Sequence, residues 1–192
     1  MMLDILQKKF SKSDSDIIDI VLYGSVARGK EKPADIDLLV IFRSKTLKER
    51  LHIIQEMKHS LDVSFPVDMK SILLEELLDP SFFGRVGALV DGISIFSGKK
   101  FAHRLGFEGK SIVVYSLKNK SHTEKVQFNY LLRGRYGQGI LERVGATHLA
   151  PGVVLVPSEN SEEFYSVLKL HNISFESYQM LMGPHTQFST NH

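Results

Sequence analysis

Two carboxylates and a glycine–serine pair stand close together in the first quarter of the chain. Gly24 and Ser25 end one apolar run, and Asp35 and Asp37 open the next. Side chains alternate along a strand, so Asp35 and Asp37 are expected on one face of it, where they would repel each other without a cation nearby. Hard carboxylate oxygens suit Mg²⁺. The pattern therefore predicts a magnesium site beside the turn at Gly24.

The turn itself has the residues of a phosphate site. Gly24 permits a tight backbone turn, and Ser25 follows at a predicted helix start, where free N–H groups favour a phosphate. Arg28 lies one turn further on, where its forked guanidinium can reach a triphosphate. We interpret Gly24, Ser25 and Arg28 as nucleotide-binding residues. For Arg28, a solvated loop charge is the alternative.

The surrounding pattern indicates the elements that position these residues. The runs 17–23 and 36–42 are short, branched and bounded by turn residues, which is typical of buried strands. The spacing of apolar residues predicts amphipathic helices over 2–10 and 46–61. The second of these has Thr46 and Glu49 in the positions of a capping box.

A third strand is predicted over residues 63–69. Pro66 within it cannot donate a ladder hydrogen bond, so this strand is expected at the edge of the sheet or at a bulge. The strand would carry Asp68 toward the end of the predicted site.

These features together resemble a known family. Gly24-Ser25, nine intervening residues and then Asp35-Ile36-Asp37-Leu38 resemble the signature of the DNA polymerase beta-like nucleotidyltransferases. The short GSVARG…DIDLLV form is most similar to the minimal nucleotidyltransferases, those of MNT type. The resemblance covers residues 2–100. It implies a mixed sheet flanked by helices, and Mg²⁺-dependent transfer of a nucleoside monophosphate from an NTP to an acceptor hydroxyl, with release of pyrophosphate.

The resemblance also implies a third carboxylate on the strand after the second long helix, and Asp68 matches it by position. The chemistry gives a separate reason, because activating a hydroxyl with a second metal requires a carboxylate cluster. We therefore expect Asp35, Asp37 and Asp68 to be catalytic and metal-binding, with a two-ion site as one form. Asp62 is the competing choice for the third position, although its place at a loop–strand junction predicts a solvated side chain.

Composition limits the class of protein. A chain of 192 residues with 43% apolar and 24% charged residues is typical of one large or two small globular domains. No apolar run approaches the ~20 residues of a membrane span, and the N-terminus lacks the apolar core of a secretory signal. The absence of cysteine excludes a disulfide framework and a cysteine-ligated zinc site. A cytoplasmic enzyme without a membrane partner is the simplest interpretation.

A polar, glycine-bearing run near residues 99–108 divides the chain. We predict a nucleotidyltransferase domain over 1–100, a linker over 101–110 and a small accessory domain over 111–192. The accessory elements are expected in the order strand, helix, loop, helix, strand, helix, strand, with Asn160 capping the last helix. That order predicts helices on one face of a small sheet, so the fold class is α+β in both domains.

Positive charge gathers in the first part of the accessory domain. Residues 110–143 contain seven basic and two acidic residues, whereas 144–192 contain one basic and four acidic residues. Arg133, Arg135 and Tyr136 lie at a glycine-rich loop in the basic segment, which is typical of a polyanion site. The G-x-x-G run there faintly resembles the nucleic-acid clamp of KH domains, although the elements after it depart from the KH order. An ordinary basic surface is the alternative.

The acceptor and partners are left open by the sequence. Besides the NTP, the resemblance allows an RNA end, a small molecule such as an aminoglycoside, or a protein as acceptor. Minimal nucleotidyltransferases often act as antitoxins that modify a HEPN-type toxin, but they usually consist of the first domain alone, and the accessory domain here departs from that pattern. A second hypothesis is a non-catalytic nucleotide- or RNA-binding regulatory protein built on the same fold.

Overall fold

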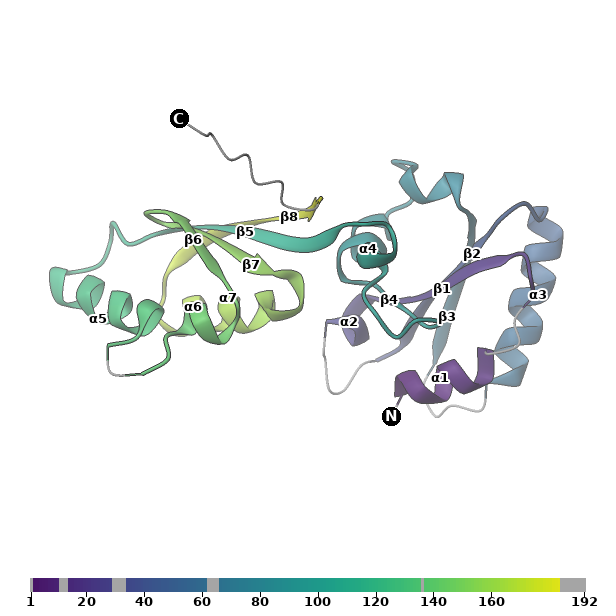
Figure 1. The fold of residues 1–192 in the computed structure, drawn as a ribbon, viewed down its shortest axis with the longest axis horizontal. Coiled ribbons are helices and arrows are strands. Elements are labelled where there is room, and N and C mark those ends of the chain that lie inside the picture. Colours follow the sequence, from purple (N-terminus) through teal and green to yellow (C-terminus); the bar gives the residue numbers. More distant parts are fainter. Residues whose placement is uncertain (1, 11–13, 29–33, 62–65, 136, 184–192) are drawn as a thin grey trace, which may run out of the picture. The chain divides into compact units, whose positions relative to one another are not determined.

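The computed structural model describes residues 2–10, 14–28, 34–61, 66–135 and 137–183. The chain forms two compact units, Met1–Gly106 and Phe107–His192 (Figure 1). The segment 101–110, expected as a linker, contains helix α4 (Phe101–Arg104) and the first residues of strand β5 (Glu108–Ser116). Within the described residues, no helix combines the length and apolar character that crossing a membrane requires.

A mixed four-stranded sheet forms the centre of the first unit, in the order β3-β2-β1-β4. Strand β1 is antiparallel to β2 and β4, and β2 is parallel to β3. The mixed sheet predicted from the sequence is therefore confirmed, as are both ends of its first two strands. The strands are β1 (Ile17–Tyr23), β2 (Ile36–Phe42), β3 (Val67–Leu73) and β4 (Ile93–Ser94).

Different helices of this unit cover the two faces of the sheet. Leu6 and Phe10 of α1 and Ile54 of α3 join one core cluster with alternate residues of β1 and β2. The short π-helix η2 lies against the other face, where a Cβ atom on Gly87 would lie 3.7 Å from the Tyr23 ring. Besides α4, the helices are α1 (Met2–Phe10), α2 (Gly24–Ala27), α3 (Leu47–Ser60), the 3-10 helix η1 (Glu75–Leu78) and η2 (Gly87–Asp91).

The third strand begins later than the sequence predicts. It was expected over 63–69, whereas β3 starts at Val67 and continues to Leu73; residues 62–65 lie outside the described part of the chain. Pro66 directly precedes the strand, and its carbonyl accepts a hydrogen bond from the Ile36 N–H at 2.9 Å. Strand β3 is at the edge of the sheet, which is the position that a proline at a strand end favours.

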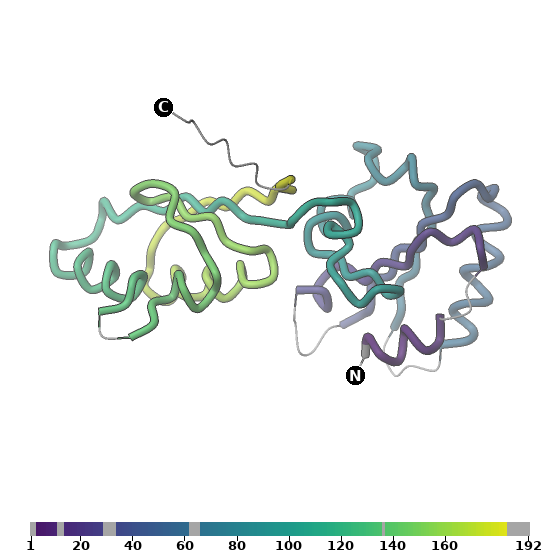
Figure 2. Tube along the Cα trace, in the orientation of Figure 1, coloured from purple at the N-terminus to yellow at the C-terminus, as the bar shows by residue number. Residues whose placement is uncertain are grey.

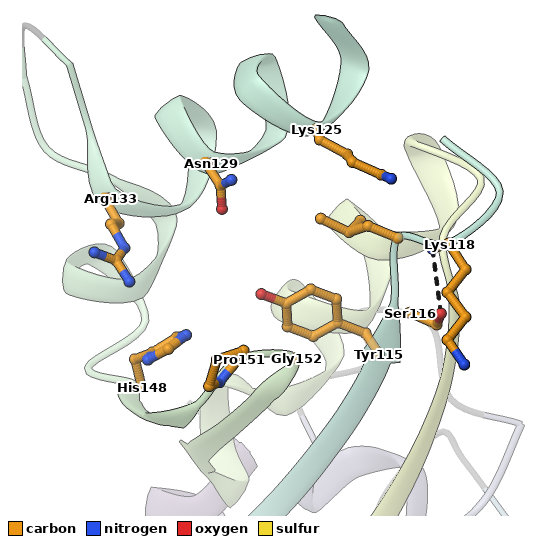
Figure 3. Close-up of a pocket in the computed structure, with 10 residues that line it drawn as sticks. Tyr115, Ser116, Lys118, Lys125, Asn129, Arg133, His148, Pro151 and Gly152 are labelled. Carbon is orange, nitrogen blue, oxygen red and sulfur yellow. Dashed lines mark hydrogen bonds between the residues drawn. The ribbon is translucent and has the colours of Figure 1, made fainter. Parts of the chain in front are cut away.

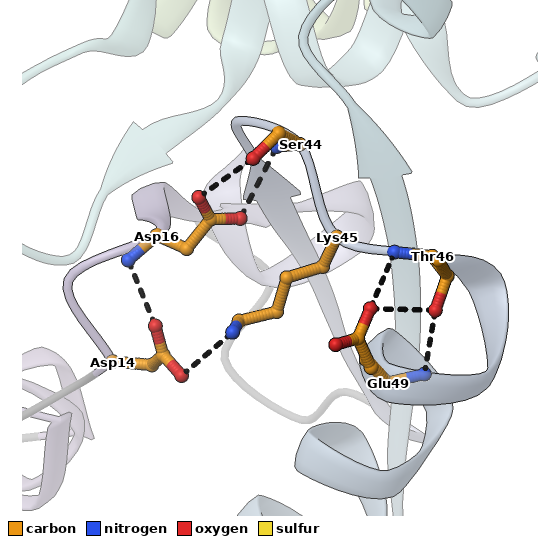
Figure 4. A network of polar contacts seen from close by, with 6 residues as sticks. All are labelled: Asp14, Asp16, Ser44, Lys45, Thr46 and Glu49. Carbon is orange, nitrogen blue, oxygen red and sulfur yellow. Dashed lines mark hydrogen bonds and ion pairs between the residues drawn. The ribbon is translucent and has the colours of Figure 1, made fainter.

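The capping box predicted for the long helix is present at the start of α3. Thr46 Oγ1 accepts a hydrogen bond from the Glu49 N–H at 3.4 Å, and the Glu49 carboxylate accepts one from the Thr46 N–H at 2.9 Å. Beside it, Asp16 accepts hydrogen bonds from the backbone and side chain of Ser44, each at 3.2 Å (Figure 4). These contacts fix the start of α3 to the turns that precede β1 and follow β2.

A buried carboxylate joins α4 to the sheet. Asp19 on β1 has no exposed surface; it accepts hydrogen bonds from Ser94 Oγ at 2.9 Å and from the Ile20 N–H at 2.8 Å, and it pairs with Arg104 of α4. Burial raises the pKa of Asp19, against the opposing effects of Ser94 and Arg104. The pair therefore holds α4 against the sheet while offsetting the charge that burial disfavours.

The second unit is an antiparallel sheet with its helices on one face (Figure 1). Val113, Val154 and Val156 of the sheet pack against Phe128 and Phe164 of the helices. Strands β5 and β8, from the two ends of the unit, run side by side (Figure 2). The remaining elements are α5 (His122–Arg133), α6 (Ile140–Arg143), β6 (Thr147–Ala150), β7 (Val153–Pro157), the 3-10 helix η3 (Ser158–Asn160), α7 (Ser161–Leu170) and β8 (Ser174–Met182).

Two details of this unit correct the sequence prediction. Strand β6, paired with β7, was missed, so the order is β-α-α-β-β-α-β. The Asn160 cap was wrong, because the Asn160 side-chain amide donates to the Val144 carbonyl at 3.0 Å and makes no capping bond to α7. Asn160 therefore joins α7 to the end of α6.

We expect Arg104→Ala to lower the free energy of unfolding at pH 7 by about 3 kcal/mol, because it leaves the buried Asp19 carboxylate without its cation. The folded-state pKa of Asp19 is already raised, so protonation favours the folded state as the pH falls. The loss should therefore shrink at acidic pH. Urea unfolding at two pH values measures it, with the exposed Arg43→Ala as control. Equal losses in both variants would contradict the structural role of the pair.

Candidate functional site

Two carboxylates stand side by side across strands β2 and β3. The parallel register pairs Asp37 with Asp68, which places their Cα atoms about 4.8 Å apart. Ile36 and Leu38, on either side of Asp37, are fully buried in the core beneath the opposite face. Asp35 lies at the bend just before β2 and is exposed. The fold therefore brings the three predicted carboxylates to one end of one sheet face.

The electrostatics of this group are unfavourable in the absence of a cation. Burial raises the pKa of Asp37, and the charges of Asp35 and Asp68 raise it further, while Lys70 and Arg28 oppose the shift. Lys70 Nζ lies 3.6 Å from Asp68 Oδ2, and both side chains are about half exposed. The site is thus an acidic cluster that two protein cations offset only in part.

The turn after β1 lies directly against this cluster. Tyr23, the last residue of β1, is paired with Asp37, and Gly24 follows with φ at +75°. A Cβ atom at Gly24 would lie 2.1 Å from Asp37 Oδ2 and 3.0 Å from its Cγ. Both the backbone conformation and the close approach therefore require glycine at this position.

The other two predicted nucleotide-binding residues follow this turn. Ser25 lies in α2, a helix of four residues, and so short a helix contributes little macrodipole of its own. The Arg28 guanidinium is 3.9 Å from the buried carboxylate of Asp91, and its side chain is 41% exposed. Its charge also lowers the pKa of Asp37. Arg28 is accordingly within electrostatic reach of both the buried Asp91 and the acidic cluster.

Tyr23 is a site residue that the sequence analysis missed. Its hydroxyl is buried and has no hydrogen-bond partner among the described residues. Burial, followed by the charges of Asp37 and Asp68, raises the pKa of Tyr23 to about 12. The hydroxyl therefore stays protonated at neutral pH and is available as a donor close to the carboxylates. Its position directly before Gly24, on the same face as Asp37, was the available signal.

The donor set of Asp35, Asp37 and Asp68 fits a hard divalent cation, because it consists of carboxylate oxygens. The side chains do not converge on one point, however: over the part of the chain that the structure describes, no group of three or more His, Cys, Asp or Glu side chains is arranged to hold a metal. Asp68 instead faces Lys70. Joint binding of a cation by all three would require Asp68 to exchange this ion pair for the metal.

Comparison with protein families agrees with this geometry. Residues 6–86 match the family described as polymerase beta, nucleotidyltransferase. These residues form a polymerase beta-type nucleotidyltransferase domain. The match includes the Gly24 turn and all three carboxylates, and it confirms the family that the GSVARG…DIDLLV pattern predicts. It does not extend to the second unit.

Comparison with individual proteins adds little to the family match. No curated protein matches the chain. One solved structure, described as "Crystal structure of the toxin-antitoxin with AMP-PNP", is 20% identical, with a TM-score of 0.38 over 55% of this chain and 80% of that one. A likeness of this degree does not bear on substrate or partner, so the finer assignment to the minimal nucleotidyltransferases stays a prediction.

Outside the nucleotidyltransferase domain, the residues predicted for polyanion binding do not lie together in one site. Arg133, the last residue of α5, lines a cavity of the second unit. The Arg135 guanidinium instead stacks over the Tyr130 ring, 4.7 Å from its centroid. Tyr136 lies outside the described residues. The structure therefore separates Arg133 from Arg135, which the sequence had grouped.

We expect Gly24→Ala to destabilise the nucleotidyltransferase domain more than Gly106→Ala does. Gly106 also has a positive φ, +78°, but a Cβ there would meet nothing within 4 Å, so its substitution isolates the backbone strain of about 1–2 kcal/mol. Gly24→Ala adds a collision with Asp37, worth a further ~1–3 kcal/mol. Urea unfolding compares the two variants. Equal losses of unfolding free energy in the two variants would show that the Asp37 side chain moves aside without cost.

We expect Asp37→Asn to stabilise the domain without divalent cations by about 0.5–2 kcal/mol, because it removes a carboxylate whose raised pKa disfavours the folded state at neutral pH. Mg²⁺ at about 100 times its Kd should add about 2.7 kcal/mol to the wild type and much less to the variant. Thermal unfolding with and without Mg²⁺ measures both effects. Glu56→Gln, at an exposed position of α3, serves as control. A magnesium shift that Asp37→Asn retains would argue against this metal site.

Proposed function

We propose that this protein is a cytoplasmic, Mg²⁺-dependent nucleotidyltransferase that moves a nucleoside monophosphate from an NTP to an acceptor hydroxyl and releases pyrophosphate. The observation that carries the proposal is the pairing of Asp37 with Asp68 directly beside the Gly24 turn, in a domain of the polymerase beta type. The acceptor belongs to an RNA end, a small molecule or a protein.

Each residue of the site has a role in this reaction. The backbone at Gly24 and the Ser25 hydroxyl would bind the β and γ phosphates, and Arg28 would contact the triphosphate from the end of α2. Asp35 and Asp37 would bind the nucleotide-associated Mg²⁺, and Asp68 would complete a second metal site. Bound Mg²⁺ supplies charge neutralisation at the phosphates and lowers the pKa of the attacking hydroxyl.

The chemical step is an in-line substitution at the α phosphorus. The acceptor oxygen bonds to this phosphorus while the bond to the α–β bridging oxygen breaks, and pyrophosphate leaves with that electron pair. Asp68 is exposed and adjacent to Asp37, so it is the carboxylate that we assign to help remove the acceptor proton. If Asp68 ligated the metal, Lys70 would lose its present partner and would be free to contact a phosphate of the leaving group.

Pyrophosphate release from each NTP, with candidate acceptors and Mg²⁺ present, tests the proposal. We expect Asp35→Asn/Asp37→Asn to lower the rate at least about 100-fold, because metal binding contributes several kcal/mol to the transition state. Glu56→Gln should retain the wild-type rate, since α3 packs beneath the opposite face of the sheet. Mass spectrometry of co-purifying RNA, small molecules and proteins, a HEPN-type toxin among them, would identify the acceptor.

Two results would contradict the assignment. Activity that survives the double substitution would place the chemistry elsewhere. Metal-dependent nucleotide binding in calorimetry, with no product from any NTP and acceptor, would favour the non-catalytic binding protein instead.

A further inference from the structure

The second unit contains a cavity of about 420 Å³ that the nucleotidyltransferase reaction does not use. It lies beside the end of β5, along one side of α5 and against β6 and the turn before β7 (Figure 3). Its size is that of a site for a nucleotide-sized ligand. The polar residues that line it are Tyr115, Ser116, Lys118, Lys125, Asn129, Arg133 and His148.

Helix α5 supplies the wall of this cavity with hydrogen-bond donors. Lys125, Asn129 and Arg133 follow one another at intervals of four residues, so they form one stripe along the helix. Phe128 and Leu132 form the neighbouring buried stripe, which packs in the core of the unit. The same helix therefore stabilises the fold with one stripe and presents donors with the next.

The charge of the cavity has one sign. Among the described residues that line it, none is Asp or Glu, and the side chains of Lys118, Lys125, Arg133 and His148 form no ion pair with a described residue. Tyr115 is 8% exposed, and its hydroxyl points toward the side of the cavity that holds Arg133 and His148 (Figure 3). The cavity thus offers several donors and lacks an anion.

The spacing of the cations suits an extended anion with more than one charged group. Lys125 and Arg133 are eight residues apart on α5, which is about 12 Å along the helix axis. Two or more linked phosphoryl groups can contact both side chains without either one having to fold back toward the other. Burial raises the pKa of Tyr115, although the Arg133 charge opposes this, so its hydroxyl is a neutral donor at physiological pH.

We propose that this cavity binds the polyphosphate of a nucleotide, with one phosphoryl group at Arg133 and His148 and another toward Lys118 and Lys125. The polyphosphate belongs either to a free nucleotide or to the 5′-triphosphate end of an RNA strand. None of the three carboxylates lines this cavity, so the proposal can be tested separately from the proposed catalytic function.

Calorimetry on the full chain without divalent cations tests the proposal, with pyrophosphate and a 5′-triphosphorylated oligoribonucleotide as probes. We expect Arg133→Gln and Lys125→Gln each to weaken binding at least about tenfold, the effect of losing one hydrogen bond to a charged group. Both side chains line an open cavity, so the variants should keep the wild-type melting temperature. Amide NMR shifts should localise the probe to residues 115–118 and Gly152.

Three comparisons make the result specific. Arg135→Gln removes the same charge two residues further on, outside the cavity, and should leave the affinity unchanged. Asp35→Asn/Asp37→Asn should also bind the probes normally. The two probes separate the two sources, since an RNA-end site should bind the triphosphorylated oligoribonucleotide more tightly than pyrophosphate and a free-nucleotide site should not. The matching oligoribonucleotide with a 5′-hydroxyl lacks the polyphosphate and should not bind in the cavity. Absence of binding at millimolar pyrophosphate and with the triphosphorylated RNA, or equal losses in Arg133→Gln and Arg135→Gln, would overturn the assignment.

Discussion

Repulsion between the carboxylates of Asp37 and Asp68 is the constraint on which the first unit depends. The parallel pairing of β2 with β3 fixes the two residues opposite each other. Neither strand can shift by one residue without turning its apolar side chains away from the core, because side chains alternate along a strand. The charges therefore stay adjacent, and Lys70 and Arg28 offset them only in part, since the pKa of Asp37 remains raised. This uncompensated negative charge favours the binding of a cation at the site.

A second acidic residue on the same sheet, Asp19, shows how a buried carboxylate with a structural role is paired. Asp19 is more deeply buried than Asp37, yet it has Arg104, Ser94 and a backbone N–H as permanent partners. Asp37 instead lies directly against Gly24 and close to the Tyr23 hydroxyl, which has no hydrogen-bond partner among the residues that the structure describes. The partners of Asp19 offset part of the cost of burying its charge. Acidic residues left with repelling neighbours, as Asp37 is, are typical of functional sites.

Local signals made much of the first unit predictable. The strands 17–23 and 36–42 are bounded by turn residues, and α3 begins with a capping box that Thr46 and Glu49 specify. The start of β3 was not predictable in this way, because apolar residues alternate through 63–69 and only pairing with β2 selects Val67 as the first residue. Strand β6 was missed since its side chains are mostly exposed and show no apolar alternation. Tyr23 was missed because an aromatic residue at the end of a buried strand usually belongs to the core.

The basic segment of the second unit shows a further limit of sequence reasoning. Arg133 and Arg135 are equivalent in composition, but Gly134, with φ at +79°, ends α5 between them and sends the chain in a new direction. Arg133 keeps the direction of the helix stripe and lines the cavity, whereas Arg135 stacks on Tyr130. A charge count therefore detects the excess of cations but cannot separate the side chains that converge from those that do not.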